Sequence, residues 1–365
     1  MSNNSTVWCG LPPVFYQIKD QVYFYVFYVL TPFYFLVAFT GHILLIIGFV
    51  KQAKKDSSYT YQIYLTIVKS MEIVFFTTFV ISFKWLSGIE SSGQLWYQKN
   101  IVLMWFAAHA VVPMQNSCIT TSLLMAVAMA ADRVFALWKP FVYKTIDHKK
   151  HHVLAVFFCV FLGWSSSVFD WFRFRLEFNG EYYRGMVNSA YVGGLLAQVL
   201  ANTRNVLRAI GVISLIACNV AIIALFERKA LVKENLVNGA DRRMSVAEER
   251  RKTDRKASER ALIIIIIGQS IAITISVGMF VAFYVIVYAL PSFSLCPSGI
   301  LFACVMDALL ELGDVGTFLL VATVDKKVRR TIARALGWKE SQVHAMPTTF
   351  NPSPRPSIAP SSNRH

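Results

Sequence analysis

The chain has 365 residues, of which 55% are hydrophobic and only 16% are charged. Soluble globular domains have about a quarter of their residues charged, so this composition excludes an ordinary soluble domain and predicts a protein embedded in a membrane. The formal net charge is +15, but the Lys and Arg residues lie between hydrophobic runs instead of on one soluble face. That arrangement argues against a nucleic-acid partner.

Long apolar runs recur along the whole chain. A helix needs roughly 20 mostly apolar residues to cross a bilayer. Runs of that length cover residues 22–50, 61–83, 101–131, 153–172, 204–226, 261–290 and 300–324. We therefore predict an all-α membrane protein with a seven-transmembrane helix bundle over residues 22–324, which places the two ends of the chain on opposite sides of the membrane.

Basic residues are distributed unevenly between those two sides. Of the 36 Lys and Arg residues, 27 fall in four segments, namely 51–60, 132–152, 227–260 and 325–365. Such residues collect on the cytoplasmic side, so we predict an extracellular N-terminus over residues 1–21. N-glycosylation sequons begin at Asn3 and Asn4, which agrees with this orientation. The chain is expected to be a multi-pass protein of the cell membrane.

The segment 227–260 has many charges of both signs and no apolar periodicity across its middle. It is predicted to be a basic, flexible cytoplasmic loop, with a helix extending into each of its ends. Ser245 and Ser258 each follow closely on paired basic residues. A phosphate there would add about two negative charges and weaken the docking of a partner; incidental serines in a solvated loop are an equally good interpretation.

Residues 325–338 place Val328, Ile332 and Leu336 four residues apart, with basic residues on the other faces. This pattern predicts a short amphipathic cytoplasmic eighth helix that lies on the lipids of the inner leaflet. Residues 339–365 are rich in Pro, Ser and Asn, which predicts a disordered tail.

Two of the six cysteines, Cys9 and Cys296, fall in segments assigned to the outside. That compartment permits oxidation, so we predict a disulfide between them. The other four lie in apolar runs, where a cysteine is usually a small hydrophobic side chain.

Acidic residues interrupt the second and seventh runs. Asp307, Glu311 and Asp314 are four and three residues apart, so they line one face of a helix, and Glu72 lies at a depth comparable to Asp314. A charge at the centre of a bilayer costs about 2.5 to 3.5 kcal/mol, so these residues must face the interior of the bundle. We expect a pocket that attracts positive charge, with Asp307 and Glu311 near an external ligand and Asp314 with Glu72 at a deeper, sodium-like site. A hydrated polar network that only packs the bundle is the alternative. No metal site is expected elsewhere.

The string from Asp132-Arg133-Val134 through Pro140 to Tyr143, at the inner end of the third run, resembles the Asp-Arg-Tyr signature of rhodopsin-like G-protein-coupled receptors. It also matches that signature in the alanine four residues and the proline eight residues after the acid. The resemblance implies that Arg133 contacts a heterotrimeric G protein in the active state and that Asp132 restrains it in the inactive state.

Several family features differ here. Ala108 stands where the family usually has a cysteine, and the sixth and seventh runs lack Cys-Trp-x-Pro and Asn-Pro-x-x-Tyr. The chain therefore looks like a divergent branch, such as invertebrate peptide or chemosensory receptors. Gln115, beside Asn116, occupies the position where amine receptors carry an aspartate, which disfavours a small amine and adds both residues to the expected ligand pocket. The seventh run has no lysine that would hold retinal, and no cofactor is expected.

Other classes of protein remain as alternatives. A cation channel or transporter would use the acidic stripe of the seventh run, and a non-signalling seven-span decoy would explain the missing switch motifs. The chain has no Gly-rich phosphate loop, no His-Glu-x-x-His and no serine-nucleophile elbow, so we predict that it is not an enzyme.

Overall fold

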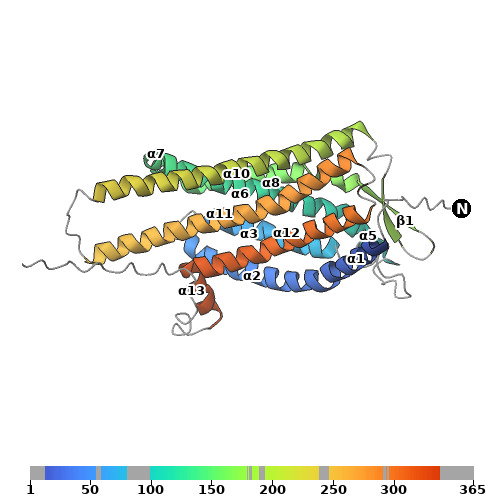
Figure 1. The fold of residues 1–365 in the computed structure, drawn as a ribbon, viewed down its shortest axis with the longest axis horizontal. Coiled ribbons are helices and arrows are strands. Elements are labelled where there is room, and N and C mark those ends of the chain that lie inside the picture. The colour runs from blue at the N-terminus through green and yellow to red at the C-terminus, as the bar shows by residue number, and fades with distance from the viewer. Residues whose placement is uncertain are drawn as a thin grey trace, which may run out of the picture.

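The computed structural model describes residues 13–54, 59–79, 99–178, 180, 183–188, 194–237, 246–290, 293 and 296–337. Asn3, Asn4, Cys9 and Ser245 lie outside the described residues. Most of the described chain is helical, and the long helices run side by side in one elongated bundle (Figure 1).

The helices and strands follow one another in this order: α1 (Pro13–Phe24), η1 (Tyr25–Leu30), α2 (Thr31–Ala53), α3 (Tyr59–Phe79), α5 (Ile101–Phe106), η3 (Ala107–Val111), α6 (Val112–Trp138), α7 (Pro140–Thr145), α8 (His148–Ser165), η4 (Val168–Phe172), β1 (Phe174–Phe178), β2 (Tyr183–Val187), α10 (Leu195–Val237), α11 (Val246–Ala289), α12 (Pro297–Val324) and α13 (Lys326–Ala335). Figure 1 places β1 at one end of the bundle and α7 and α13 at the other. We call these the hairpin end and the α13 end.

Five helical stretches of the described chain are long and apolar enough to cross a membrane: Gln17–Ala53, Ile101–Trp138, Lys150–Phe172, Gln198–Lys229 and Glu259–Ala289. Many of the large side chains exposed on them are apolar, among them Phe157, Ile213 and Val285. Such a surface suits lipid better than water. The fold is therefore that of an all-α protein suited to a membrane. The other two predicted spans are also helices, α3 and α12, but they carry buried charges.

Proline shapes the first and third predicted spans. In each, a short π-helical segment, η1 or η3, ends two residues before a proline, Pro32 or Pro113. A proline has no backbone N–H to donate to the previous turn, so the helix shifts its hydrogen bonds there. At η1 the backbone N–H and the Oγ1 of Thr31 both donate to the carbonyl of Val26.

Several helices are longer than the sequence predicts. The first begins at Pro13, so part of the predicted extracellular segment 1–21 is helical. The fifth continues as α10 to Val237, and the sixth begins at Val246. All of the described part of 227–260 is therefore helix, as predicted for the two ends of this segment, and residues 238–245 between them lie outside the described residues. Both helices extend past the rest of the bundle at the α13 end (Figure 1).

A two-stranded antiparallel hairpin at the opposite end was not predicted. β1 pairs with β2 so that Phe174 faces Val187 and Phe178 faces Tyr183. Short strands of this kind are hard to read from sequence, because five residues give too few alternations to separate a strand from a loop. The hairpin follows η4 directly and contacts α5, η3 and η4 at that end of the bundle.

The third predicted span forms the centre of the bundle. α6 contacts α3, α8, α10 and α11, and its buried side chains Leu123, Met125, Ala126 and Met129 belong to the main apolar core. Because α6 runs through this core, it connects the polar groups at the hairpin end with those at the α13 end.

The amphipathic helix α13 packs partly on the bundle. Asp325 accepts hydrogen bonds from the backbone N–H groups of Lys327 and Val328, which caps the helix, and it also accepts one from the hydroxyl of Tyr59 at 2.7 Å. Val328 and Ile332 are buried against α2, whereas Leu336 is 46% exposed. Only part of the predicted apolar face is therefore free to lie on lipid.

Candidate functional site

Polar groups gather at three places along the bundle. One is the junction of α6, α7 and α8 at the α13 end, one is a buried charge cluster between α3 and α12, and one is a cavity at the hairpin end. Each contains residues from helices that are distant in the sequence.

At the α13 end, Asp132 joins three helices. Its Oδ2 lies 3.4 Å from Nη2 of Arg133 and accepts a hydrogen bond of 3.0 Å from the hydroxyl of Tyr143, while its Oδ1 lies 3.4 Å from Nε2 of His152. α6 ends just beyond, since Lys139 precedes Pro140 and a residue before proline disfavours helical backbone. Asp132 therefore holds Arg133 against the bundle and links α6 to α7 and α8.

The middle of the bundle contains a buried ion triad. The ammonium of Lys69 lies 3.1 Å from Oε1 of Glu72 and 3.2 Å from Oδ1 of Asp314, and these side chains are 9%, 1% and 5% exposed. Ser122 donates a hydrogen bond to the second oxygen of Glu72. The position where a free cation was expected, between Glu72 and Asp314, is thus beside an ammonium group that belongs to the chain itself.

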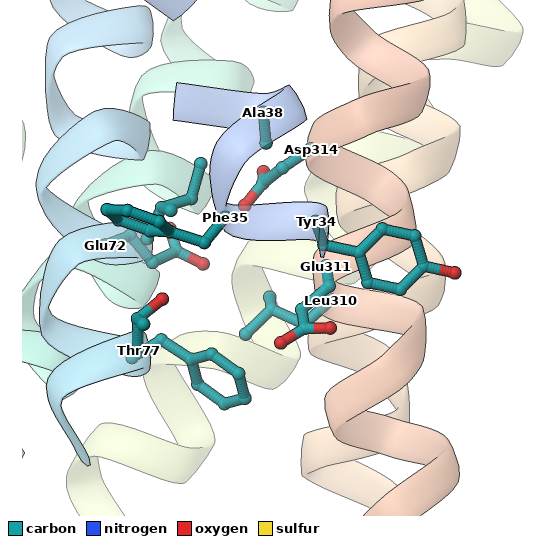
Figure 2. A pocket seen from close by; sticks show the side chains of 10 residues that line it. Tyr34, Phe35, Ala38, Glu72, Thr77, Leu310, Glu311 and Asp314 are labelled. Atoms are coloured by element: carbon teal, nitrogen blue, oxygen red, sulfur yellow. The ribbon is translucent and has the colours of Figure 1, made fainter. Parts of the chain in front are cut away.

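A small cavity of about 10 Å³ adjoins this triad. Figure 2 shows Glu72 of α3 and Asp314 of α12 pointing towards each other, and Tyr34 and Phe35 of α2 line the same cavity. A void of this size holds about one water molecule. Glu311 also lines it, and its Oε2 has no hydrogen-bond partner among the described residues. The acidic stripe is therefore part of the packed interior and leaves no room for a ligand.

The cavity at the hairpin end is much larger, about 840 Å³. It lies between η4, α10 and α11, and its size falls in the range of small-molecule binding sites. The charged and aromatic residues along its walls include Asp170, Arg173, Arg204 and Tyr284.

Arginines dominate the polar wall of this cavity. Arg204 forms a buried ion pair with Asp170, whose Oδ2 also accepts a hydrogen bond of 3.0 Å from the amide of Asn116. Arg208, one helical turn deeper and 0% exposed, donates to the hydroxyl of Thr120 and to the backbone carbonyl and side-chain oxygen of Asn116.

Arg173 is the third guanidinium of this region. Burial lowers its pKa, but Tyr284 and Asp170 beside it raise that pKa above the ordinary value, so the group is charged at neutral pH. The described side chains at this site thus place three guanidinium groups around one carboxylate, that of Asp170. We call these four residues the arginine site. The region is positively charged in an interior that is poor in water.

The expected pocket residues separate into different places. Asn116 contacts the arginine site, whereas Glu72, Glu311 and Asp314 lie in the packed interior between α3 and α12. Asp307 and Gln115 are buried on α12 and α6, and neither lines the large cavity.

The sequence interpretation missed the arginine site. A signal was present, because Arg204 and Arg208 stand four residues apart at the start of an apolar run and Asp170 lies inside another. Ionisable residues within apolar runs mark functional sites by default. The same argument holds for these three residues as for the acids of the seventh run.

The remaining predicted sites are only partly described. Cys296 is disulfide-bonded, and Cys118, Cys159, Cys218 and Cys304 carry free thiols. Because Cys9 lies outside the described residues, its pairing with Cys296 stays a prediction. Ser258 lies on α11, but its side chain is not described. Within the described part of the chain, no group of three or more His, Cys, Asp or Glu side chains is arranged to hold a metal ion.

Comparison with known proteins assigns no family to this architecture. No family model matches the chain, and no curated protein matches it at a significant level. The likeness of the Asp132 to Tyr143 string to rhodopsin-like receptors therefore stays an expectation that rests on those residues alone.

Proposed function

We propose that the protein is a seven-transmembrane receptor of the cell membrane that binds an extracellular ligand at the hairpin end and activates a heterotrimeric G protein at the α13 end. The observation that carries this proposal is the carboxylate of Asp132, which contacts Arg133, Tyr143 and His152 together. A half-buried arginine held by a carboxylate at a helix junction is a two-state element. When the helices separate, the guanidinium is released towards a partner.

The shape of the α13 end supports a protein partner there. α10 and α11 extend past the bundle at this end, and α13 lies beside it with basic residues on its exposed faces (Figure 1). These elements and the junction around Arg133 would together present a basic surface to the cytoplasm, in agreement with the Lys and Arg distribution.

Seven spans require that α3 and α12 also cross the membrane. Their charges are the objection, since an unpaired charge in a bilayer is costly. In this bundle Lys69 lies within 3.2 Å of Glu72 on α3 and of Asp314 on α12, so one ammonium group pairs with both of these carboxylates where they are buried. With that pairing, α3 and α12 are acceptable spanning helices.

The test is guanine-nucleotide exchange on a panel of G proteins, in membranes that carry the wild type, Arg133→Ala or Arg175→Ala, with extracts of peptides and small odorants added. Arg175 is exposed on the hairpin, so its replacement controls for the loss of an arginine. We expect ligand-stimulated exchange for the wild type and for Arg175→Ala, and its loss for Arg133→Ala.

Other outcomes separate the rival functions. Equal exchange by all three proteins would contradict the role of Arg133. No exchange with any G protein, despite surface expression, would favour a non-signalling decoy. Flux of labelled cations through the wild type would favour a channel or transporter, although the cavity of about 10 Å³ beside the acidic stripe offers no open path.

A further inference from the structure

The cavity between η4, α10 and α11 combines size with an unusual excess of buried positive charge. Arg173 and Arg204 line the cavity, and Arg208 lies one helical turn deeper, behind the lining residues. Arg204 and Arg208 are 2% and 0% exposed. Burying a guanidinium is costly unless anions pair with it. Asp170 is the one carboxylate among the described side chains here, and its Oδ2 is already shared between Arg204 and Asn116.

Two guanidinium atoms of this cluster lack partners. Nε of Arg204 and Nη1 of Arg208 are both buried and have no hydrogen-bond partner among the described residues. A buried donor left without an acceptor destabilises the protein, and more so when the group is charged. The site therefore has unused donors as well as unbalanced charge, and an acidic group would satisfy both.

The rest of the cavity is largely apolar. Val206 and Ala209 of α10 face Val281 and Val285 of α11 across it. Val206 and Val285 are more than half exposed, so they form part of the open rim between the outer halves of the two helices. A ligand that enters here meets apolar side chains before its polar end reaches the arginines.

From these observations we infer that this cavity is the ligand site of the proposed receptor and that it takes an amphipathic anion, with one carboxylate, sulfate or phosphate group on an apolar body. That the bound anion is the ligand of a receptor rests on the proposed function. That the cavity binds such an anion does not. The acidic group would pair with Arg204 and Arg173, and the apolar body would lie between α10 and α11. Guanidinium groups suit this role because they bind oxyanions through two parallel hydrogen bonds.

Asp170 is then an internal competitor for the ligand. Its carboxylate contacts Arg204, so an incoming anion must share or replace that contact. Removing the charge of Asp170 would strengthen the binding of an anion. If Asp170 and Arg204 were only a structural ion pair, the same change would weaken the site or unfold the protein. A ligand site and a structural ion pair therefore predict opposite changes in anion binding when the charge of Asp170 is removed.

The experiment measures saturation binding of tritiated decanoate to the purified full-length chain in phosphatidylcholine nanodiscs, with empty nanodiscs as background. Unlabelled decanoate, decanol and acetate are the competitors. Decanol keeps the apolar chain without the charge, and acetate keeps the charge without the chain. We expect saturable binding that unlabelled decanoate displaces and that decanol and acetate do not.

A second set of nanodiscs, which also contains phosphatidylserine, distinguishes the two sources of such an anion. If this lipid lowers decanoate binding, an anionic headgroup competes for the arginines from within the membrane. If it has no effect, the site selects an acid that arrives from water. Both outcomes support an amphipathic anion and identify where it comes from.

Three variants test the residues. Arg204→Gln should weaken decanoate binding by about tenfold or more, a change of about 1.4 kcal/mol. Arg228→Gln, an exposed arginine near the other end of the same helix, should leave binding unchanged. Asp170→Asn should strengthen decanoate binding by a factor similar to the loss expected for Arg204→Gln. Because Arg204→Gln removes a buried ion pair, its folding is checked by size-exclusion chromatography, and Asp170→Asn keeps the inference testable if that variant does not fold.

The inference would be overturned by equal displacement with decanol and decanoate, by absence of saturable binding in both kinds of nanodisc, or by a folded Asp170→Asn variant that binds decanoate more weakly. No G protein is present in this assay. Failure here with intact exchange through Arg133 would reject the ligand chemistry alone, whereas binding without exchange would reject the receptor function alone.

Discussion

Asp132 is the residue on which the closed state of the α13 end depends. It has three partners, Arg133, Tyr143 and His152, on three helices. Its side chain is 7% exposed, and low exposure strengthens electrostatic contacts because water screens them less.

Replacing Asp132 by asparagine should raise basal nucleotide exchange several-fold without ligand. The variant keeps the shape of the side chain and its hydrogen bond to Tyr143 but loses the charge that holds Arg133. The control is Asp147→Asn, an exposed acid at the start of α8, which should leave basal exchange unchanged. Basal exchange at or below the wild-type level in a folded Asp132→Asn protein would contradict the restraining role.

Lys69 is the residue that makes the acidic stripe compatible with a packed interior. Without its ammonium, Glu72 and Asp314 would face each other across a cavity that holds about one water molecule. The spacing of three residues along α3 puts Lys69 near Glu72, but only the packing of α3 against α12 brings its ammonium to Asp314 as well.

The substitution Lys69→Met should lower the free energy of unfolding by about 3 to 5 kcal/mol, since breaking a buried ion pair leaves an uncompensated charge. Thermal unfolding of the purified protein in detergent measures this change. Lys51→Met, at an exposed position on α2, is the control and should have little effect. Adding Glu72→Gln and Asp314→Asn to Lys69→Met should restore part of the loss; a further loss instead would show that the lysine contributes mainly through packing.

At the scale of elements, glycines decide how closely helices approach. A Cβ atom on Gly48 would lie 2.7 Å from Cγ1 of Val328, which is fully buried where α13 meets α2. Valine is stiff at χ1 and has little room to move aside. By contrast, a Cβ atom on Gly278 of α11 would meet nothing within 4 Å.

Gly48→Ala should therefore destabilise the protein by about 1 to 3 kcal/mol through overpacking. Gly278→Ala is the matched control and should be neutral or stabilising by up to about 1 kcal/mol, because alanine favours helix over glycine. Thermal unfolding of the two variants side by side makes the comparison. If both variants unfolded at the same temperature, the packing of α13 against α2 would not have the close geometry described here.

At the scale of the whole molecule, the number of spans decides the topology. With the N-terminus outside, a protein of five spans has α3 and α12 on one side of the membrane, with Lys144 outside and Glu177 inside. A protein of seven spans has Lys144 inside and Glu177 outside. Both residues are exposed in the structure, so a cysteine at either position is open to a reagent on its own side.

Labelling of intact cells with a membrane-impermeant maleimide separates the two topologies. We expect Glu177→Cys to react on intact cells and Lys144→Cys to react only after permeabilisation. The wild type gives the background from the native thiols, of which Cys118, Cys159 and Cys304 are buried. The reverse pattern would reject the seven-span topology with an extracellular N-terminus and, with it, the cytoplasmic position of Arg133.

The helical, membrane-suited class of the protein and its long helices could be predicted from the sequence, because apolar length is a local property of one stretch of chain. The sequence also placed Asp132 and Arg133 at a helix end, and it predicted that the fifth and sixth helices continue into the charged segment between them. The π segments could not be predicted, because they depend on hydrogen bonds around Pro32 and Pro113.

The pairing of the buried charges could not be predicted from the sequence. Lys69 lies between Glu72 and Asp314, and Arg204 lies on Asp170, although α3 and α12 or η4 and α10 are far apart in the sequence. Spacing along one helix shows which residues share a face, but it does not show which neighbour that face meets. That depends on the rotation and depth of each helix in the bundle, which the packing of all the helices sets together.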